Sequence, residues 1–265
     1  MHLRTDDGVR LDLTESGPAD GRPVVLLAGF KAAAASWRFQ VPALARAGYR
    51  VLAVDLPGHG ATEPMAPGAT MRRRARDVGA VLEQLDLRDV TLVGGSMGGN
   101  TVWAYVAERG TARLRSVVIV DQTPKMLNTA DWPYGYYGYD ESNRDTYFAA
   151  GPPPTGHGSS VWLRGMRTLR LLRAMAGGSR TITDPELEVL GDHARADWRP
   201  VIARCDVPAL FVAGAESELW PSGHAAAAAR IAPHGTAAVI AKDGHAANIE
   251  QPAAFNRGLL EFLAR

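Results

Sequence analysis

Residues 90–100 read VTLVGGSMGGN, and this stretch decides the fold. VTLVGG has the apolar, β-branched character of a buried parallel strand, and a helical pattern follows it directly. Between the two, residues 94–98 (GGSMG) fit the spacing G-x-S-x-G. In a sharp turn from strand to helix, the hydroxyl of Ser96 would project above the strand ends, and only small residues fit two positions to either side. The sequence therefore predicts Ser96 as a nucleophile; the alternative is a glycine-rich turn with an idle serine.

Short apolar runs alternate with helical patterns on both sides of this stretch. The runs with strand character are 9–16, 23–30, 49–60 (ending in a glycine-rich turn), 90–96, 114–124, 207–216 and 236–242. The helical patterns between and after them are 36–48, 70–86, 97–110, 224–232 and 251–265. Such alternation is typical of an α/β fold in which helices cover both faces of a mostly parallel sheet.

The alternation stops between residues 123 and 200. This segment begins with aromatic, glycine and proline residues and continues with helical patterns at 161–175 and 184–198. We expect a cap insertion at 123–200, and a core formed by 1–122 and 201–265. Aromatic side chains of the cap and its surroundings are predicted to line an apolar substrate pocket, although they could instead hold the cap together. The predicted pocket residues are Trp132, Tyr134, Tyr137, Trp162 and Trp220, with Trp37, Tyr136, Tyr139, Tyr147 and Phe148 as further candidates.

A serine hydroxyl needs a base to act as a nucleophile at neutral pH. His245, in the loop sequence KDGHAANIEQP after the last strand pattern, is the predicted base; the alternative is an ordinary surface histidine. His59 is expected to fix a turn. The negative charge that develops on an attacked carbonyl needs two donors, and we expect the backbone N–H groups of Met97 and Phe30 to form this oxyanion hole.

Four motifs together resemble the α/β-hydrolase superfamily, specifically its capped, esterase-like members. They are LLAGF (26–30, with Ala28 where the family usually has histidine), DLPGHGAT (55–62), GGSMGG (94–99) and GHAANIEQP (244–252). The resemblance implies an α/β-hydrolase fold: a mostly parallel eight-stranded sheet with helices on both faces and a mainly helical cap insertion. It also implies a serine hydrolase that cleaves an ester, lactone or thioester through an acyl-enzyme. A carbon–carbon bond hydrolase, a lyase, a perhydrolase and a low-turnover ligand-binding protein remain alternatives.

The catalytic acid departs from the commoner pattern of this family. That pattern puts the acid three residues after Gly214, where this chain has Ser217. Asp121 ends the strand pattern after the nucleophile helix, and parallel strands end at the same edge of a sheet. We therefore predict Asp121 as the acid, with Glu218 as the first alternative and Glu216 as the second.

Composition excludes several other classes of function. The 265 residues have a net charge of +1, which gives no overall basic field for nucleic acid, and the basic run MRRRAR at 71–76 is interpreted as a solvated helix face. The N-terminus lacks the apolar region of a secretory signal, and no stretch is apolar enough to span a membrane. One cysteine and seven scattered histidines predict no disulfide, metal site or cofactor. We expect a cytoplasmic protein with a small-molecule substrate; the sequence carries no signal of its oligomeric state.

Overall fold

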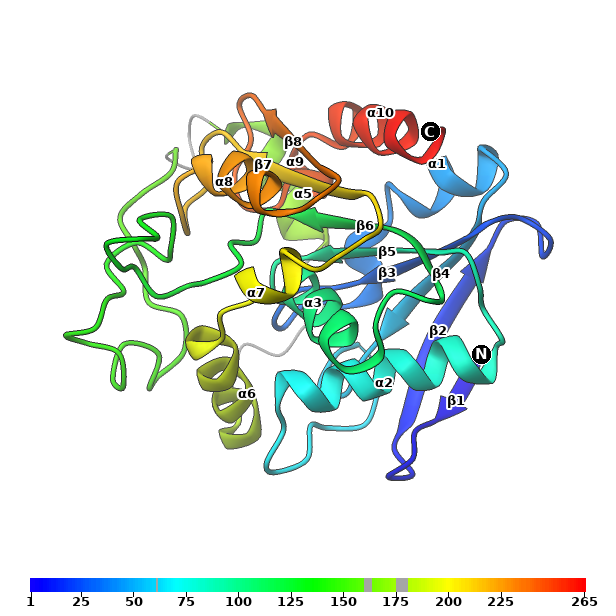
Figure 1. The fold of residues 1–265 in the computed structure, drawn as a ribbon, viewed down its shortest axis with the longest axis horizontal. Helices are drawn as coiled ribbons and strands as arrows, with labels where there is room; N and C mark the ends of the chain where they lie inside the picture. Colours follow the sequence, from blue (N-terminus) through cyan, green and yellow to red (C-terminus); the bar gives the residue numbers. More distant parts are fainter. Residues whose placement is uncertain (61, 160–163, 175–180) are drawn as a thin grey trace.

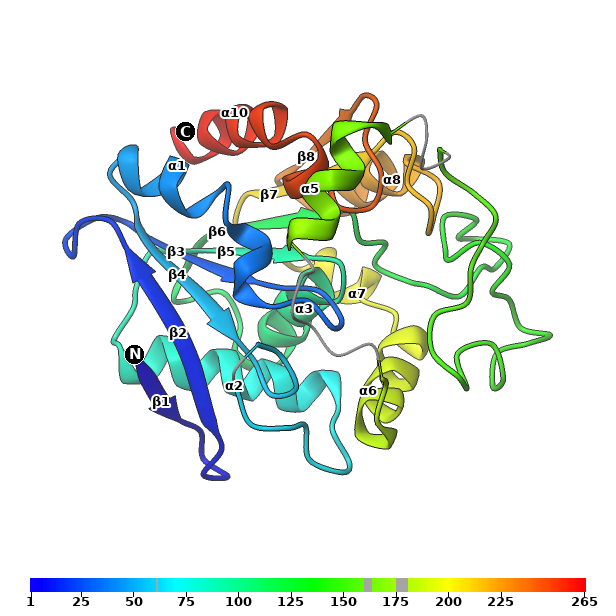
Figure 2. The same cartoon turned by 180° about the vertical axis from the view of Figure 1, so that it is seen from behind.

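The computed structural model describes residues 1–60, 62–159, 164–174 and 181–265, and Figures 1 and 2 show its two sides. Within these residues eight strands form one sheet, which confirms the α/β class. The strands are β1 (His2–Arg4), β2 (Arg10–Ser16), β3 (Pro23–Leu27), β4 (Arg50–Asp55), β5 (Val90–Gly95), β6 (Leu114–Val120), β7 (Ala209–Gly214) and β8 (Gly235–Ile240). Seven of them match predicted runs, whereas the three-residue β1 is too short to produce a periodic pattern.

The strand order is β1-β2-β4-β3-β5-β6-β7-β8. β2 pairs antiparallel with β1 and β4, and the remaining neighbours in this order are parallel. The register places Gly94 of β5 beside Leu27 of β3 and Ile119 of β6, and it places Val120 of β6 beside Val212 of β7. The carboxyl ends of these four strands therefore lie side by side, and the loops that leave them meet at one edge of the sheet.

Helices cover both faces of the sheet; in Figures 1 and 2, α1 and α10 lie above it and α2 lies below it. The helices outside the segment between β6 and β7 are η1 (Ala34–Trp37), α1 (Val41–Arg46), α2 (Met71–Gln84), α3 (Met97–Arg109), α8 (Gly223–Ile231), α9 (Ala247–Glu250) and α10 (Pro252–Leu263). Val25 and Leu27 of β3 join one hydrophobic core with α2, α3 and α8, whereas Val24 and Leu26 join a second with α1 and α10. Because successive side chains point to opposite faces and both faces are buried, the strand is continuously apolar.

The segment between β6 and β7 contains the predicted cap. In its described part, residues 123–159 form turns and isolated bridges, and helix is confined to α5 (Met166–Ala174), α6 (Asp184–Arg195) and α7 (Arg199–Ile202). α6 begins at a capping box, in which Thr183 and Glu186 satisfy each other's backbone N–H groups. No helix in the described ranges combines the length and the apolar character needed to cross a membrane.

Candidate active site

Ser96 occupies a strained turn between β5 and α3. Its φ of 51° and ψ of −129° lie outside the regions that a non-glycine residue ordinarily adopts, at a cost on the order of 1–3 kcal/mol. Its N–H donates to the carbonyl oxygen of Val120 at 2.9 Å, which ties the turn to β6. A Cβ at Gly94 would overlap the backbone of Gly98, and a Cβ at Gly98 would lie 2.8 Å from the carbonyl oxygen of Ala28. The turn therefore requires both glycines, as the spacing predicts.

Ser96 and His245 line the same cavity, which has a volume of about 460 Å³. Most of its wall is small or apolar, and two α5 residues, Leu171 and Ala174, contribute to it. The other lining residues are Ala28, Gly29, Phe30, Lys31, Ala32, Ala33, Ala35, Ser36, Trp37, Gly58, Gly60, Gly95, Val120, Ala246, Asn248 and Ile249. The cavity therefore offers a mainly apolar space beside the serine.

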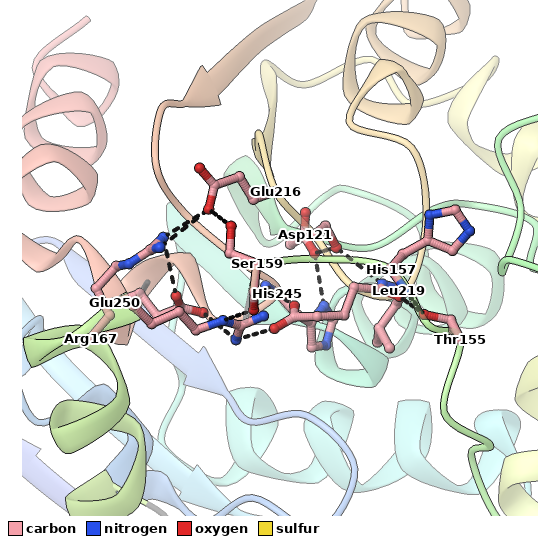
Figure 3. Close-up of polar contacts among 12 residues, drawn as sticks. Asp121, Thr155, His157, Ser159, Arg167, Glu216, Leu219, His245 and Glu250 are labelled. Atoms are coloured by element: carbon pink, nitrogen blue, oxygen red, sulfur yellow. Dashed lines mark hydrogen bonds and ion pairs between the residues drawn. The ribbon is translucent and has the colours of Figure 1, made fainter. Parts of the chain in front are cut away.

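Two carboxyl-edge loops bring Asp121 to the imidazole of His245. Asp121 Oδ2 lies 2.8 Å from His245 Nδ1 (Figure 3). The carboxylate also accepts hydrogen bonds from the Gly214 N–H to Oδ1 at 2.9 Å and from the Ser217 hydroxyl to Oδ2 at 2.6 Å. Ser217 stands where the commoner family pattern has the acid. Its hydroxyl holds the carboxylate that contacts the histidine.

Asp121 remains ionised despite complete burial. Burial alone would raise its pKa, but hydrogen bonds and charge from His224 and His245 hold the pKa at about 2. His224 Nε2 lies 3.5 Å from Asp121 Oδ1 and is itself buried. Nothing in the alanine-rich sequence around His224 indicated this position, because the contact depends on how α8 packs against β7 and β8. A carboxylate that stays charged at neutral pH can fix the orientation of His245 there.

The predicted oxyanion donors, Met97 and Phe30, lie on two segments next to Ser96. Met97 is the first residue of α3, so its N–H has no acceptor within the helix. Phe30 follows Gly29 in the loop after β3, and a Cβ on Gly29 would lie 2.9 Å from Ser96 Cβ. The backbone of this loop therefore runs directly against the serine.

Comparison with known proteins places these features in a family. The family model described as "alpha/beta hydrolase fold" matches residues 22–252. The chain belongs to the α/β-hydrolase family.

Its relatives are enzymes, and so is this α/β hydrolase. It is 30% identical to the non-heme chloroperoxidase CPO-A1 of Kitasatospora aureofaciens over 98% of each chain. The structure of a bromoperoxidase from Bacillus anthracis superimposes with a TM-score of 0.79 at 26% identity, covering all of both chains. The esterase EaEST from Exiguobacterium antarcticum has the same fold, with a TM-score of 0.81 at 20% identity, covering 100% of this chain and 99% of that one.

The two glutamates considered as alternative acids contact other groups in this hydrolase. Glu218 accepts the backbone N–H of His245 at 2.8 Å and forms an ion pair with Arg164. Glu216 binds Arg167 of α5 at 3.2 Å (Figure 3). The structure therefore brings Asp121 to the His245 ring. Both glutamates attach residues in and just before α5 to the loop after β7, and Glu218 also contacts the backbone of His245.

The predicted pocket aromatics lie elsewhere, except for Trp37. Trp132, Tyr134, Tyr137 and Trp220 are not among the described residues that line the cavity, and Trp162 falls outside the described residues. Most of these side chains pack against other rings. Ring centroids lie 5.3 Å apart in Trp132 and Tyr134, 3.6 Å apart in Tyr137 and His157, and 5.3 Å apart in Trp220 and His245. Trp220 thus packs against the ring of His245. The alternative interpretation, in which the aromatic residues serve for packing, describes these four residues better.

Asp243, two residues before His245, gives the enzyme an expected pH dependence of stability. Burial, followed by the charges of Glu250 and Asp121, raises the pKa of Asp243 to about 8. This folded-state pKa lies above the unfolded value of 3.8. At a pH between these two values the folded protein binds more protons than the unfolded protein, so the free energy of unfolding falls as the pH rises across this range. We expect the free energy of unfolding to decrease by on the order of 4 kcal/mol between pH 5 and pH 9, as measured by urea denaturation.

The variant Asp243→Asn should flatten this dependence. Flattening will be partial, because burial also raises the pKa of Glu250 and acts in the same direction. Asp145→Asn is the matched control, since the side chain of Asp145 is 84% exposed. Parallel pH curves for the wild type and Asp243→Asn would contradict the prediction.

Proposed function

We propose that the protein is a serine hydrolase that cleaves an ester, lactone or thioester bond of a small, mainly apolar substrate through an acyl-enzyme. The observation that carries the proposal is the 2.8 Å contact between Asp121 and His245 Nδ1, with His245 and Ser96 lining one cavity. Asp121 holds Nδ1–H, which leaves the Nε2 lone pair of His245 free to act as a base.

The reaction follows from these roles. His245 Nε2 takes the proton of the Ser96 hydroxyl as Oγ attacks the carbonyl carbon, and the N–H groups of Phe30 and Met97 bind the resulting oxyanion. When the tetrahedral intermediate collapses, His245 gives the proton to the leaving alcohol or thiol. Water then attacks the acyl-enzyme with the same proton transfers in reverse, which releases the acid and restores Ser96.

The cavity supports an uncharged substrate. Lys31 is the one cationic side chain among the described lining residues. Its Nζ is 2.6 Å from Glu186 Oε1 and donates to the carbonyl oxygen of Thr181 at 3.0 Å, so its charge is already neutralised. Because Leu171 and Ala174 of α5 contribute to the wall, we propose that residues 123–200 act as a cap that limits the size of the substrate.

Perhydrolysis is a second candidate, favoured by the names of the relatives. Among these are a non-heme chloroperoxidase and a bromoperoxidase. Hydrogen peroxide can replace water in the second step: one peroxide oxygen bonds to the acyl carbon, the Ser96 ester bond breaks, and a peracid leaves. A peracid released in this way oxidises halide in solution, so the same Ser96 acyl-enzyme serves both activities.

Active-site labelling and a series of p-nitrophenyl esters test the proposal. We expect a fluorophosphonate to label Ser96 stoichiometrically, and we expect short acyl chains to be cleaved faster than long ones. With peroxide present, the ratio of peracid to acid measures the second activity. A folded protein that neither reacts with the fluorophosphonate nor cleaves any ester of the series would refute the proposed function.

A further inference from the structure

Asp55, at the end of β4, and His59, in the turn after it, hold the oxyanion loop (residues 28–33, between β3 and η1) at two points. Asp55 Oδ1 accepts the backbone N–H of Ala34 at 2.6 Å, at the far end of the loop. His59 Nε2 lies 3.0 Å from the carbonyl oxygen of Gly29, at the near end. The His59 side chain is only 4% exposed, and its own backbone N–H donates to Leu56 at 3.0 Å. The imidazole is therefore buried and held against the loop.

The contact at Gly29 acts on the same peptide unit that supplies the oxyanion donor. The carbonyl of Gly29 and the N–H of Phe30 belong to one trans peptide group, so they are coplanar and point in opposite directions. An acceptor contact on one side thus fixes the direction of the donor on the other. We infer that His59 is a positioning residue for the oxyanion hole: it donates Nε2–H to the Gly29 carbonyl and so aims the Phe30 N–H at the substrate oxygen. This inference rests on the proposed function.

The proton on His59 determines which of its contacts is a hydrogen bond. Nδ1 lies 3.1 Å from the carbonyl oxygen of Pro57, so both ring nitrogens face acceptors. Burial, with the nearby charge of Arg74, lowers the pKa of His59 to about 4, so the ring is neutral at neutral pH and has one N–H to donate. Donation to Gly29 also polarises the peptide, which strengthens its N–H as a donor.

The variants His59→Gln and His59→Asn test the inference. A glutamine amide reaches the position of Nε2 and keeps a donor for Gly29, whereas an asparagine amide reaches only the position of Nδ1, next to Pro57. We expect His59→Asn and His59→Phe to lower kcat on a p-nitrophenyl ester by about 10–100-fold with KM changed by less than about threefold. We expect His59→Gln to stay within about threefold of the wild type. The rate of fluorophosphonate labelling should fall in parallel with kcat.

The control is His193→Phe, because His193 is a buried histidine of α6, 3% exposed, that does not line the cavity. It should lower the unfolding midpoint without lowering kcat. Equal kcat values for His59→Asn and His59→Gln would overturn the inference, and so would a wild-type kcat for a folded His59→Phe. If turnover in these variants still depends on Ser96, the proposed function stands. If His59→Phe does not fold, the two amide variants decide the question. Turnover that does not depend on Ser96 would overturn both proposals.

Discussion

Ser96→Ala should lower kcat/KM on any ester that the enzyme cleaves by about 10⁵–10⁶-fold, and it should abolish fluorophosphonate labelling. The expected loss is large because, in the proposed reaction, the hydroxyl forms the covalent intermediate, and neither His245 nor the oxyanion donors can replace it. The turn itself should persist, since alanine keeps the Cβ and removes only the oxygen. The measurement is steady-state hydrolysis together with mass spectrometry of the labelled protein.

A matched control separates this loss from general damage. Ser142 is exposed, and its hydroxyl bonds only to Asp140 among the described residues, so Ser142→Ala should retain wild-type activity and labelling. A folded Ser96→Ala protein with more than about a hundredth of wild-type turnover would be incompatible with the acyl-enzyme route.

The turn that carries Ser96, and the strands around it, were largely predictable from the sequence because each depends on local constraints. The strands that flank Ser96 are buried on both faces and therefore appear as continuous apolar runs. Gly94 and Gly98 are required by backbone contacts within the turn itself. Local requirements of this kind leave a pattern in the sequence, whatever the rest of the chain does.

Contacts between distant segments left no such pattern. Trp132 and Trp220 were expected to line the pocket, but an aromatic residue in a segment without helix or strand periodicity has no local feature that tells a wall position from a packing position. Arg74 is similar: it belongs to a run interpreted as a solvated face, yet it is 2% exposed and its Nε donates to Thr101 of α3 at 3.0 Å. Its burial follows from the packing of α2 against α3, which the charge pattern does not encode.

The choice between Asp121 and Glu218 as the acid also depends on contacts between distant segments. Both residues follow neighbouring strands, β6 and β7, at the same edge of the sheet. The pairing of Val120 with Val212 brings Asp121 beside the N–H of Gly214, and that N–H helps to hold the carboxylate next to His245. Register and loop path thus determine which carboxylate reaches the ring, and a single sequence specifies neither directly.

Asp121→Asn should lower kcat by about 10⁴-fold, whereas Glu218→Gln should cost far less. An asparagine at 121 can present its amide N–H₂ to His245 Nδ1, which favours the imidazole tautomer that carries its proton on Nε2 and cannot accept one from Ser96. Glu218→Gln keeps an oxygen that can accept the backbone N–H of His245, so it weakens only the ion pair with Arg164. Comparable losses from the two substitutions would contradict the assignment of Asp121 as the acid.

A second substitution makes this prediction sharper, because Ser217 adjoins the same carboxylate. Its hydroxyl donates to Asp121 Oδ2 at 2.6 Å, and that oxygen is 2.8 Å from His245 Nδ1. A carboxylate introduced at position 217 therefore lies within reach of the ring. The double variant Asp121→Asn/Ser217→Asp should regain about 10–100-fold of the kcat that Asp121→Asn loses, since the acid needs only to orient the imidazole and stabilise its cation.

Ser217→Asp alone should lower stability, because it places two carboxylates together in a buried site. If the double variant folds and remains as slow as Asp121→Asn, a charge at position 217 cannot replace Asp121, and the geometry of the Asp121 carboxylate itself is what the reaction requires.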